Sequence, residues 1–286
     1  SGPALADLAA AYERFGFHAA YVTDHPAPDD RWLAGGGHHA LEPTVALAVA
    51  AAATRRLLLH TTIYVLAYRN PFLAAKALAS LDVLSDGRLV VGVAAGYLRA
   101  EFDALGADFD DRGRRLDEAL ELLPRIWSEH SVAAEGDGFR SRGVTSLPHP
   151  VQRPHPPIWV GGNSLAAMRR AVRFGQGWSP FPATGGMEKA VRTAELGDLG
   201  DLAARLERLE DLCEAAGRTD PLTTCFVPFS LPAYLEDPVG GLRALCDEVG
   251  ELSDMGVDWV ALMVPGTTRN SVIDHAGELA AELGLG

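Results

Sequence analysis

The sequence predicts an α/β fold in which short buried strands alternate with amphipathic helices. The segment 19–22 is apolar, too short for a helix and followed by polar residues, which is typical of a parallel strand covered on both faces. A helix, a glycine and a buried strand recur in this order at Gly16, Gly175 and Gly256. The length of 286 residues fits one large α/β barrel or two ordinary domains.

Hydrophobic periodicity predicts seven strands and eight helices in alternation. The predicted strands lie near residues 19–25, 57–66, 88–96, 157–162, 176–181, 222–231 and 258–266. The predicted helices lie near residues 3–15, 42–54, 71–84, 111–129, 164–174, 187–216, 238–255 and 271–284. Because no strand precedes the first helix, a barrel of eight parallel strands needs one more strand upstream of Ser1. A doubly wound open sheet is the alternative, although no GxGxxG motif follows the first strand.

The first helix and the first strand have clear boundaries. Residues 3–15 are apolar on one helical face, and Gly16 supplies the left-handed stop. The strand must end before Pro26, which cannot donate to a sheet ladder, so Asp24 and His25 lie at its C-terminal end. That end carries the chemistry in parallel α/β folds. A solvated turn pair that only ends the strand explains these two residues equally well.

Two connections are longer than a plain turn requires. Residues 26–41 are rich first in proline and then in glycine, and they predict a mobile lid. Residues 130–156 carry glycines and prolines among short apolar pieces, and they predict an excursion, such as a hairpin, before the strand at 157–162. Since no linker or low-complexity tail interrupts the chain, we expect residues 1–286 to form a single domain.

Composition argues against several functional classes. The chain has 25 Lys and Arg against 38 Asp and Glu, and this negative charge disfavours binding to nucleic-acid backbones. The longest fully apolar run, residues 45–53, is shorter than the roughly 20 residues that a bilayer requires, and no secretion signal is evident. Three widely spaced cysteines fit reduced thiols in the cytoplasm. The nine histidines contain no HExxH motif, so no metal site is expected.

Two further strand ends are candidates for a binding site. Thr61 and Thr62 place hydroxyls inside the predicted strand at 57–66, either as ligand contacts or as ordinary β-branched packing. Small residues lead to Gly96 and Tyr97 at the end of the next strand. They either let a ligand approach the backbone or mark a tight turn.

The turn Gly161-Gly162-Asn163-Ser164 joins a buried strand to an amphipathic helix. Glycines in such a turn leave backbone N–H groups free, and the helix N-terminus adds partial positive charge, so the turn predicts a phosphate site. A plain strand-to-helix turn with Ser164 or Asn163 as the N-cap is the alternative.

Four groups of residues together resemble a known family: 22–25, 81–97, 101–102 and 150–164. Their order and spacing are similar to those of the bacterial luciferase-like superfamily, and most similar to its coenzyme F420 (deazaflavin)-dependent oxidoreductases. The resemblance extends from residue 1 to the strand at 176–181, and the last third fits in architecture alone.

The resemblance implies a TIM-like (β/α)8 barrel with an insertion between strands four and five, the first strand being absent from this chain. The ring of a flavin-like cofactor would lie at the C-terminal ends of the strands. Asp24 and His25 match the family's Asp-His pair beside the reacting edge of the ring. Thr62–Ile63 matches the family's non-proline cis peptide, which backs the deazaflavin. Residues 161–163 match the turn that holds the cofactor phosphate.

The implied function is hydride transfer between coenzyme F420 and a small organic substrate. His25 would give or take the accompanying proton, with Asp24 as the acceptor that sets its tautomer. Backbone amides around Thr62–Ile63 and Gly96 would support the ring, and Tyr97 would line the substrate side. Tyr97 stands where the family's sugar-phosphate dehydrogenases place a catalytic Glu, so that activity is not expected.

Two other functions stay open. One is an FMN-dependent monooxygenase of the same superfamily, which uses molecular oxygen and a flavin reductase partner. The other is a non-catalytic ligand-binding barrel, because a fold does not guarantee activity. The family further suggests a homodimer, with no nucleic acid or membrane as partner.

Overall fold

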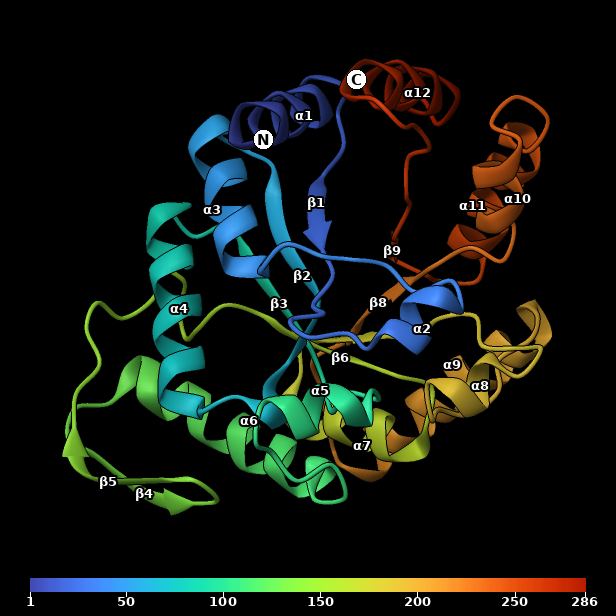
Figure 1. The fold of residues 1–286 in the computed structure, drawn as a ribbon. Coiled ribbons are helices and arrows are strands. Elements are labelled where there is room, and N and C mark those ends of the chain that lie inside the picture. The colour runs from blue at the N-terminus through green and yellow to red at the C-terminus, as the bar shows by residue number, and fades with distance from the viewer. The chain divides into compact units, whose positions relative to one another are not determined.

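The computed structural model describes residues 1–286. It contains two compact units, one formed by Ala20–Ile158 and the other by Ser1–Ala19 together with Trp159–Gly286. Each unit consists of strands that alternate with helices (Figure 1). The expectation that the chain is one domain stays a prediction.

The unit Ala20–Ile158 contains the first three strands of the chain. These are, in order, β1 (Ala19–Val22), β2 (Leu58–Val65) and β3 (Leu89–Ala94). Its helices are α2 (Asp30–Ala34), α3 (Pro43–Ala53), η1 (Leu66–Tyr68), α4 (Pro71–Leu84), α5 (Arg99–Ala104) and α6 (Arg112–Ser128). β2 and β3 pair in parallel, and a bulge on β2 shifts the register between Thr61 and Tyr64. Helices α3 and α4 run side by side along these strands (Figure 1).

Local signals set the start of both flanking helices. Pro43 and Pro71 occupy the first helical positions, where the missing N–H group costs nothing. The side chain of Glu42 accepts from Val45 N, and that of Asn70 accepts from the first-turn amides of α4. The two helices therefore begin at defined residues and fix the strands that follow them.

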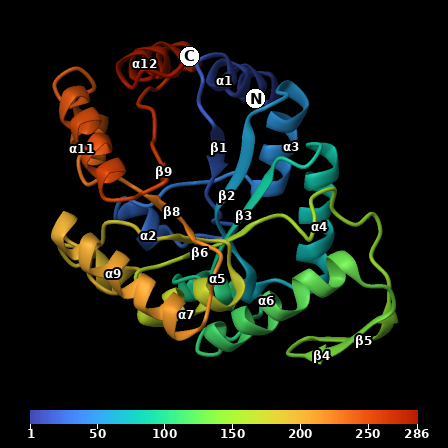
Figure 2. The same ribbon diagram turned by 180° about the vertical axis from the view of Figure 1, so that it is seen from behind.

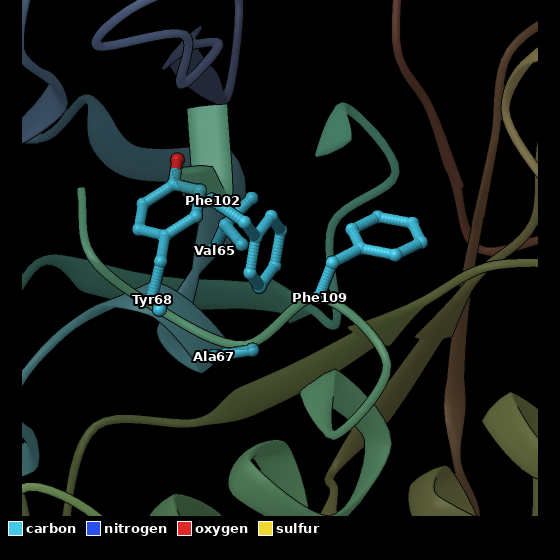
Figure 3. Close-up of a cluster of buried hydrophobic side chains, with 6 residues drawn as sticks. Val65, Ala67, Tyr68, Phe102 and Phe109 are labelled. Carbon is cyan, nitrogen blue, oxygen red and sulfur yellow. The ribbon is translucent and has the colours of Figure 1, made fainter. Parts of the chain in front are cut away.

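An aromatic cluster supports the C-terminal end of β2. Val65, Tyr68, Phe102 and Phe109 are buried together with two alanines. Figure 3 shows the Phe102 ring between those of Tyr68 and Phe109, and each neighbouring centroid is 5.2 Å away. Edge-to-face rings at this spacing attract one another, so the cluster holds η1 and α5 in place.

The segment between β3 and β6 contains an antiparallel hairpin. Its strands are β4 (Val132–Gly136) and β5 (Phe139–Val144). The hairpin lies within residues 130–156, where the sequence predicts an excursion. Its interpretation as an insertion between barrel strands four and five stays a prediction.

The other unit contains four strands in chain order. They are β6 (Ile158–Gly161), β7 (Gly177–Ser179), β8 (Thr223–Phe226) and β9 (Trp259–Val260), and each pairs in parallel with the next. Its helices are α1 (Gly2–Arg14), α7 (Leu165–Phe174), α8 (Met187–Ala190), α9 (Leu199–Ala215), α10 (Leu231–Glu236), α11 (Leu242–Asp254) and α12 (Arg269–Glu282). Figure 2 shows α1 and α12 side by side near the two chain ends.

The α/β class and the presence of all seven predicted strands are confirmed, although β1 ends at Val22 instead of residue 25, and β9 spans only Trp259–Val260 of the predicted 258–266. The predicted helix 187–216 is wrong as one element, because Asp198 accepts from Asp201 N and starts α9 as a new helix after α8. The predicted strand 222–231 ends at Phe226, because buried Glu248 accepts from the amides of Phe229 and Ser230 ahead of α10. The short helices α2, α5 and α10 were not predicted. None of the helices is long and apolar enough to span a membrane.

Candidate active site

Asp24 is buried just beyond β1 and is held by a cation. Both of its carboxylate oxygens accept from the Arg69 guanidinium, and one also accepts from Val65 N at 2.9 Å and from the Tyr68 hydroxyl at 3.2 Å. The expectation that Asp24 sets the tautomer of His25 is therefore wrong. Neighbouring side chains along an extended chain point to opposite sides, so Asp24 and His25 meet different partners.

His25 lies among polar and aromatic groups of its own unit. Its side chain is 9% exposed, and its Nδ1 lies 3.4 Å from a carboxylate oxygen of Glu101 without an aligned hydrogen bond. Its Nε2 lies 3.4 Å from the Tyr97 hydroxyl. The rings of Trp32 and His38 have centroids 4.5 and 5.1 Å from the imidazole. An imidazole in this setting has one nitrogen beside an acid and the other beside a hydroxyl.

Residues 26–41 supply the aromatic cover of His25. Asp29 caps α2 by accepting from Trp32 N at 2.9 Å. Gly37 packs under the Trp32 ring, since a Cβ there would lie 2.3 Å from a ring carbon. His38 Nε2 lies 3.0 Å from the Thr23 hydroxyl, and burial together with His25 lowers the pKa of His38. The segment covers His25 as a lid would, and its motion stays a prediction.

The bulge on β2 contains the predicted cis peptide. The Thr62–Ile63 bond is cis, which confirms the expectation from the resemblance. Both residues are partly exposed. Thr61, which was expected to contact the cofactor, is fully buried, and its hydroxyl donates to Gly92 O at 2.9 Å. The Thr61 side chain therefore takes part in the packing of the sheet. Packing is the second of the two interpretations that the sequence allowed for this residue.

A buried histidine lies behind the bulge. His60 Nδ1 is 2.9 Å from the Thr62 hydroxyl. Burial lowers the pKa of His60 to about 3, so the imidazole is neutral at ordinary pH. Gly92 faces it from β3, and a Cβ there would lie 2.7 Å from His60 Nε2. No sequence pattern indicated the role of His60.

Gly96 directs Tyr97 toward His25. Its φ of 82° lies in the left-handed region, and a Cβ would lie 2.7 Å from a methyl group of Val65. Backbone conformation and close packing therefore account for this glycine. Burial, with Glu101 adding to it, raises the pKa of Tyr97 to about 12, so the phenol stays protonated and can donate.

The predicted phosphate turn lies in the other unit and uses its amides differently than expected. Gly162 N donates to Ser179 O, and Asn163 N donates to Thr193 Oγ1 at 3.0 Å. The expectation that these two N–H groups are free for an anion is therefore wrong. Ser164 is the N-cap of α7, and its side chain accepts from Ala167 N. The sequence allowed this capping role as the alternative to a phosphate site.

Other groups near this turn remain available for a ligand. The amides of Leu165 and Ala166 open α7, where a helix offers no internal acceptor. The hydroxyl of Ser179, which is paired with Gly161 across β6 and β7, is buried without a hydrogen-bond partner. Gly162 has a φ of 112°, and a Cβ there would make only ordinary contact with Ala167 at 3.4 Å, so its conformation rather than crowding accounts for the glycine. This arrangement suits an anion at the start of α7.

A family model described as luciferase-like monooxygenase matches residues 2–229. The chain belongs to the luciferase-like monooxygenase family. The match confirms that the sequence was correctly assigned to the bacterial luciferase-like superfamily.

Relatives of this luciferase-like protein use different cofactors. An FMNH2-dependent dimethylsulfone monooxygenase from Pseudomonas putida is 41% identical over 107 residues, which are 36% of this chain and 30% of the relative. An F420-dependent glucose-6-phosphate dehydrogenase from Nakamurella multipartita is 33% identical over 222 residues, which are 76% of this chain and 60% of the relative. The chain thus spans less than two thirds of the length of either protein.

A solved structure is similar over nearly the whole luciferase-like chain. Monooxygenase RslO1 from Streptomyces bottropensis has a TM-score of 0.76 and 25% identity, covering 99% of this chain and 92% of that one. The family thus includes enzymes that use F420 and enzymes that use FMNH2.

Sequence reasoning missed four side chains around the luciferase-like Asp-His pair. They are Trp32, His38, Arg69 and Glu101. Glu101 belongs to the group 101–102 that carries the family resemblance, which was a usable signal. Arg69 gave none, because its partner is distant in sequence.

Proposed function

We propose that this luciferase-like protein is an oxidoreductase that transfers a hydride between coenzyme F420 and a small organic substrate. The observation that carries the proposal is the buried imidazole of His25, with a carboxyl group at Nδ1 and a phenol hydroxyl at Nε2. Such an imidazole can give or take the proton that accompanies a hydride. The match with the F420-dependent dehydrogenase over 222 residues, against 107 for the FMNH2-dependent relative, supports this choice of cofactor.

The residues present fit such a cofactor. When bound, a deazaflavin supplies a ring carbon that carries the hydride. The partly exposed bulge at Thr62–Ile63 would support the ring, and Gly96 would keep the adjacent backbone accessible. In the other unit, the start of α7 would suit a phosphate, because the amides of Leu165 and Ala166 and the hydroxyl of Ser179 are available there.

The chain's own groups then orient the substrate and move the proton. Tyr97 would donate to a substrate oxygen, since its raised pKa keeps the phenol protonated. His25 Nε2 would exchange the proton with that oxygen. Trp32 and His38 would exclude water from the imidazole. Asp24 would hold the end of β1 against Val65 and take no proton, because Arg69 neutralises its charge.

Binding of F420 and of FMN to the purified protein, followed separately by fluorescence, tests the cofactor. We expect F420 to bind at least tenfold more tightly, a difference of about 1.4 kcal/mol. His25→Ala should lower turnover by roughly a hundredfold to ten-thousandfold while cofactor affinity stays within a few-fold. Full activity of the folded His25→Ala variant would contradict the role of the imidazole.

A second candidate is an FMN-dependent monooxygenase, which the 41% identity to the dimethylsulfone enzyme favours. Tight FMN binding with substrate-dependent oxygen uptake in the presence of a flavin reductase would support it. Failure to bind either cofactor would favour a non-catalytic binding protein.

We further propose that the protein works as a homodimer. Leu41, Val45 and Leu73 are 63%, 66% and 72% exposed at the starts of α3 and α4, which pack against each other. Helix α3 has no charged residue. Exposed apolar side chains grouped on neighbouring helices are typical of a surface that a partner covers. A reducing compartment such as the cytoplasm would suit the three free thiols.

A further inference from the structure

We propose that Glu101 is a positioning residue that holds a proton on His25 Nδ1, so that Nε2 is the atom that exchanges protons with the substrate. This inference rests on the proposed function, because it assigns the tautomer with which His25 would act. The sequence pointed to Asp24 for this task, whereas the contacts of the two carboxyl groups favour Glu101.

Glu101 is a buried carboxyl group with few partners. The residue is 2% exposed, and its Oε1 lies 3.4 Å from His25 Nδ1 and 3.4 Å from Ala27 N. A carboxylate removed from water without a nearby cation is strongly destabilised, whereas an adjacent imidazolium offsets much of that penalty. The pair is therefore more stable when His25 Nδ1, which lies 3.4 Å from Oε1, carries a proton.

Asp24 shows what a fully paired carboxylate looks like in the same unit. It is 3% exposed and accepts from the Arg69 guanidinium, from Val65 N and from the Tyr68 hydroxyl. Arg69 also donates to Val65 O, so its side chain is committed to this contact. Glu101 is left with His25 as its basic neighbour.

The other ionisable groups near His25 do not compete for this role. Burial keeps Tyr97 and Tyr68 protonated by raising both pKa values, and Glu101 adds to each increase. Burial and His25 lower the pKa of His38, so this second imidazole does not add a positive charge at neutral pH. Glu101 is thus the group here that stabilises a proton on Nδ1.

The proton accounting follows from this geometry. With a proton on Nδ1, beside the Glu101 carboxyl group, Nε2 carries a proton in the imidazolium and a lone pair in the neutral ring. Nε2 therefore donates a proton as a hydride reaches the substrate, or accepts one as a hydride leaves. Glu101 keeps the other proton in place throughout and does not touch the substrate, as in other enzymes where an acid orients a histidine.

The first test uses the protein without cofactor and follows His25 by NMR after ¹⁵N labelling of histidine, with His25→Ala to assign its signals. In the wild type, the ¹⁵N shifts should identify the neutral ring as protonated on Nδ1. Glu101→Gln should lower the pH at which His25 titrates by at least about one unit, because it removes the opposite charge. Asp103→Asn, on the exposed side of the same helix, is the matched control and should leave that pH within about 0.2 unit.

A neutral ring protonated on Nε2 in the wild type would overturn the proposal, even if no variant of Glu101 folds. An unchanged titration of His25 in folded Glu101→Gln would also overturn it. In the F420 assay, Glu101→Gln should lower kcat by roughly tenfold to a hundredfold with cofactor affinity unchanged, and Glu101→Asp should recover part of it. If the protein does not bind F420, the proposed function fails while the NMR result still decides the role of Glu101.

Discussion

Acidification should destabilise this protein through His60, and the size of the effect can be worked from the structure. His60 is buried behind the β2 bulge, and burial lowers its pKa to about 3 from the ordinary value of 6.5. Below pH 6.5 the unfolded chain therefore binds a proton that the folded chain does not. The stability that neutral His60 allows is present in full above pH 6.5 and is lost as the pH falls toward 3.

The expected loss at pH 5 depends little on the exact pKa in the folded state. The unfolded imidazole gains RT ln(1 + 10^1.5), about 2 kcal/mol, relative to pH 8, and the folded imidazole gains almost nothing. Any folded-state pKa well below 5 gives nearly the same figure. Since whole domains are stable by only about 5–15 kcal/mol, this loss is measurable.

Urea unfolding followed by tryptophan fluorescence at pH 8 and pH 5 measures this loss. The free energy of unfolding of the wild type should fall by about 2 kcal/mol more than that of His60→Asn, which keeps a partner for the Thr62 hydroxyl. Thr62→Val is the control, because it removes that hydrogen bond and leaves the imidazole buried, so the wild-type difference should persist. Equal losses in the wild type and His60→Asn, within about 0.5 kcal/mol, would refute the reasoning.

Three further predictions concern other parts of the chain. Arg69→Met should lower the free energy of unfolding by about 3–5 kcal/mol, because it leaves buried Asp24 without a cation. Adding Asp24→Asn to this variant should recover much of the lost stability. Losses of the two substitutions that simply add in denaturation experiments would contradict the coupling. Ser179→Ala should weaken F420 binding about fivefold without lowering the melting temperature, because the buried Ser179 hydroxyl has no hydrogen-bond partner in the protein. Unchanged affinity in a titration of this variant would place the anion elsewhere. Val45→Asp should convert a dimer to a monomer in light scattering, whereas Val239→Asp, at an 86%-exposed position, should not; a dimer in both variants would rule out the α3 surface.

The sequence predicted the parts of the fold that depend on local pattern. Buried apolar runs indicated the seven parallel strands, and glycines and prolines indicated most boundaries, because periodicity and backbone restrictions act over a few residues. The helix break before Asp198 was missed, since a cap inside a long helical pattern looks like a surface residue. The Thr62–Ile63 cis bond came from the resemblance and not from the residues themselves.

Glycines in the candidate site were open to two explanations that the sequence alone could not separate. Gly92 and Gly96 lie where a side chain would strike His60 or Val65, so packing within the unit accounts for both. A Cβ at Gly162 would make only ordinary contact with its neighbours, so crowding does not explain this glycine and its positive φ does. The difference depends on which atoms face each glycine, and those atoms come from distant parts of the chain.

The partners of Asp24 and His25 show why the site was only half predicted. Both residues were correctly placed just beyond β1, although the strand ends at Val22, before the stop that Pro26 imposes. Their proximity in sequence suggested a shared hydrogen bond, yet adjacent side chains of an extended chain diverge, so each required a partner from elsewhere. Asp24 received Arg69 and became a structural anchor, while His25 received Glu101 from α5. One carboxylate is thereby neutralised by a permanent cation, and the other is left beside an imidazole, which can hold a proton on either nitrogen.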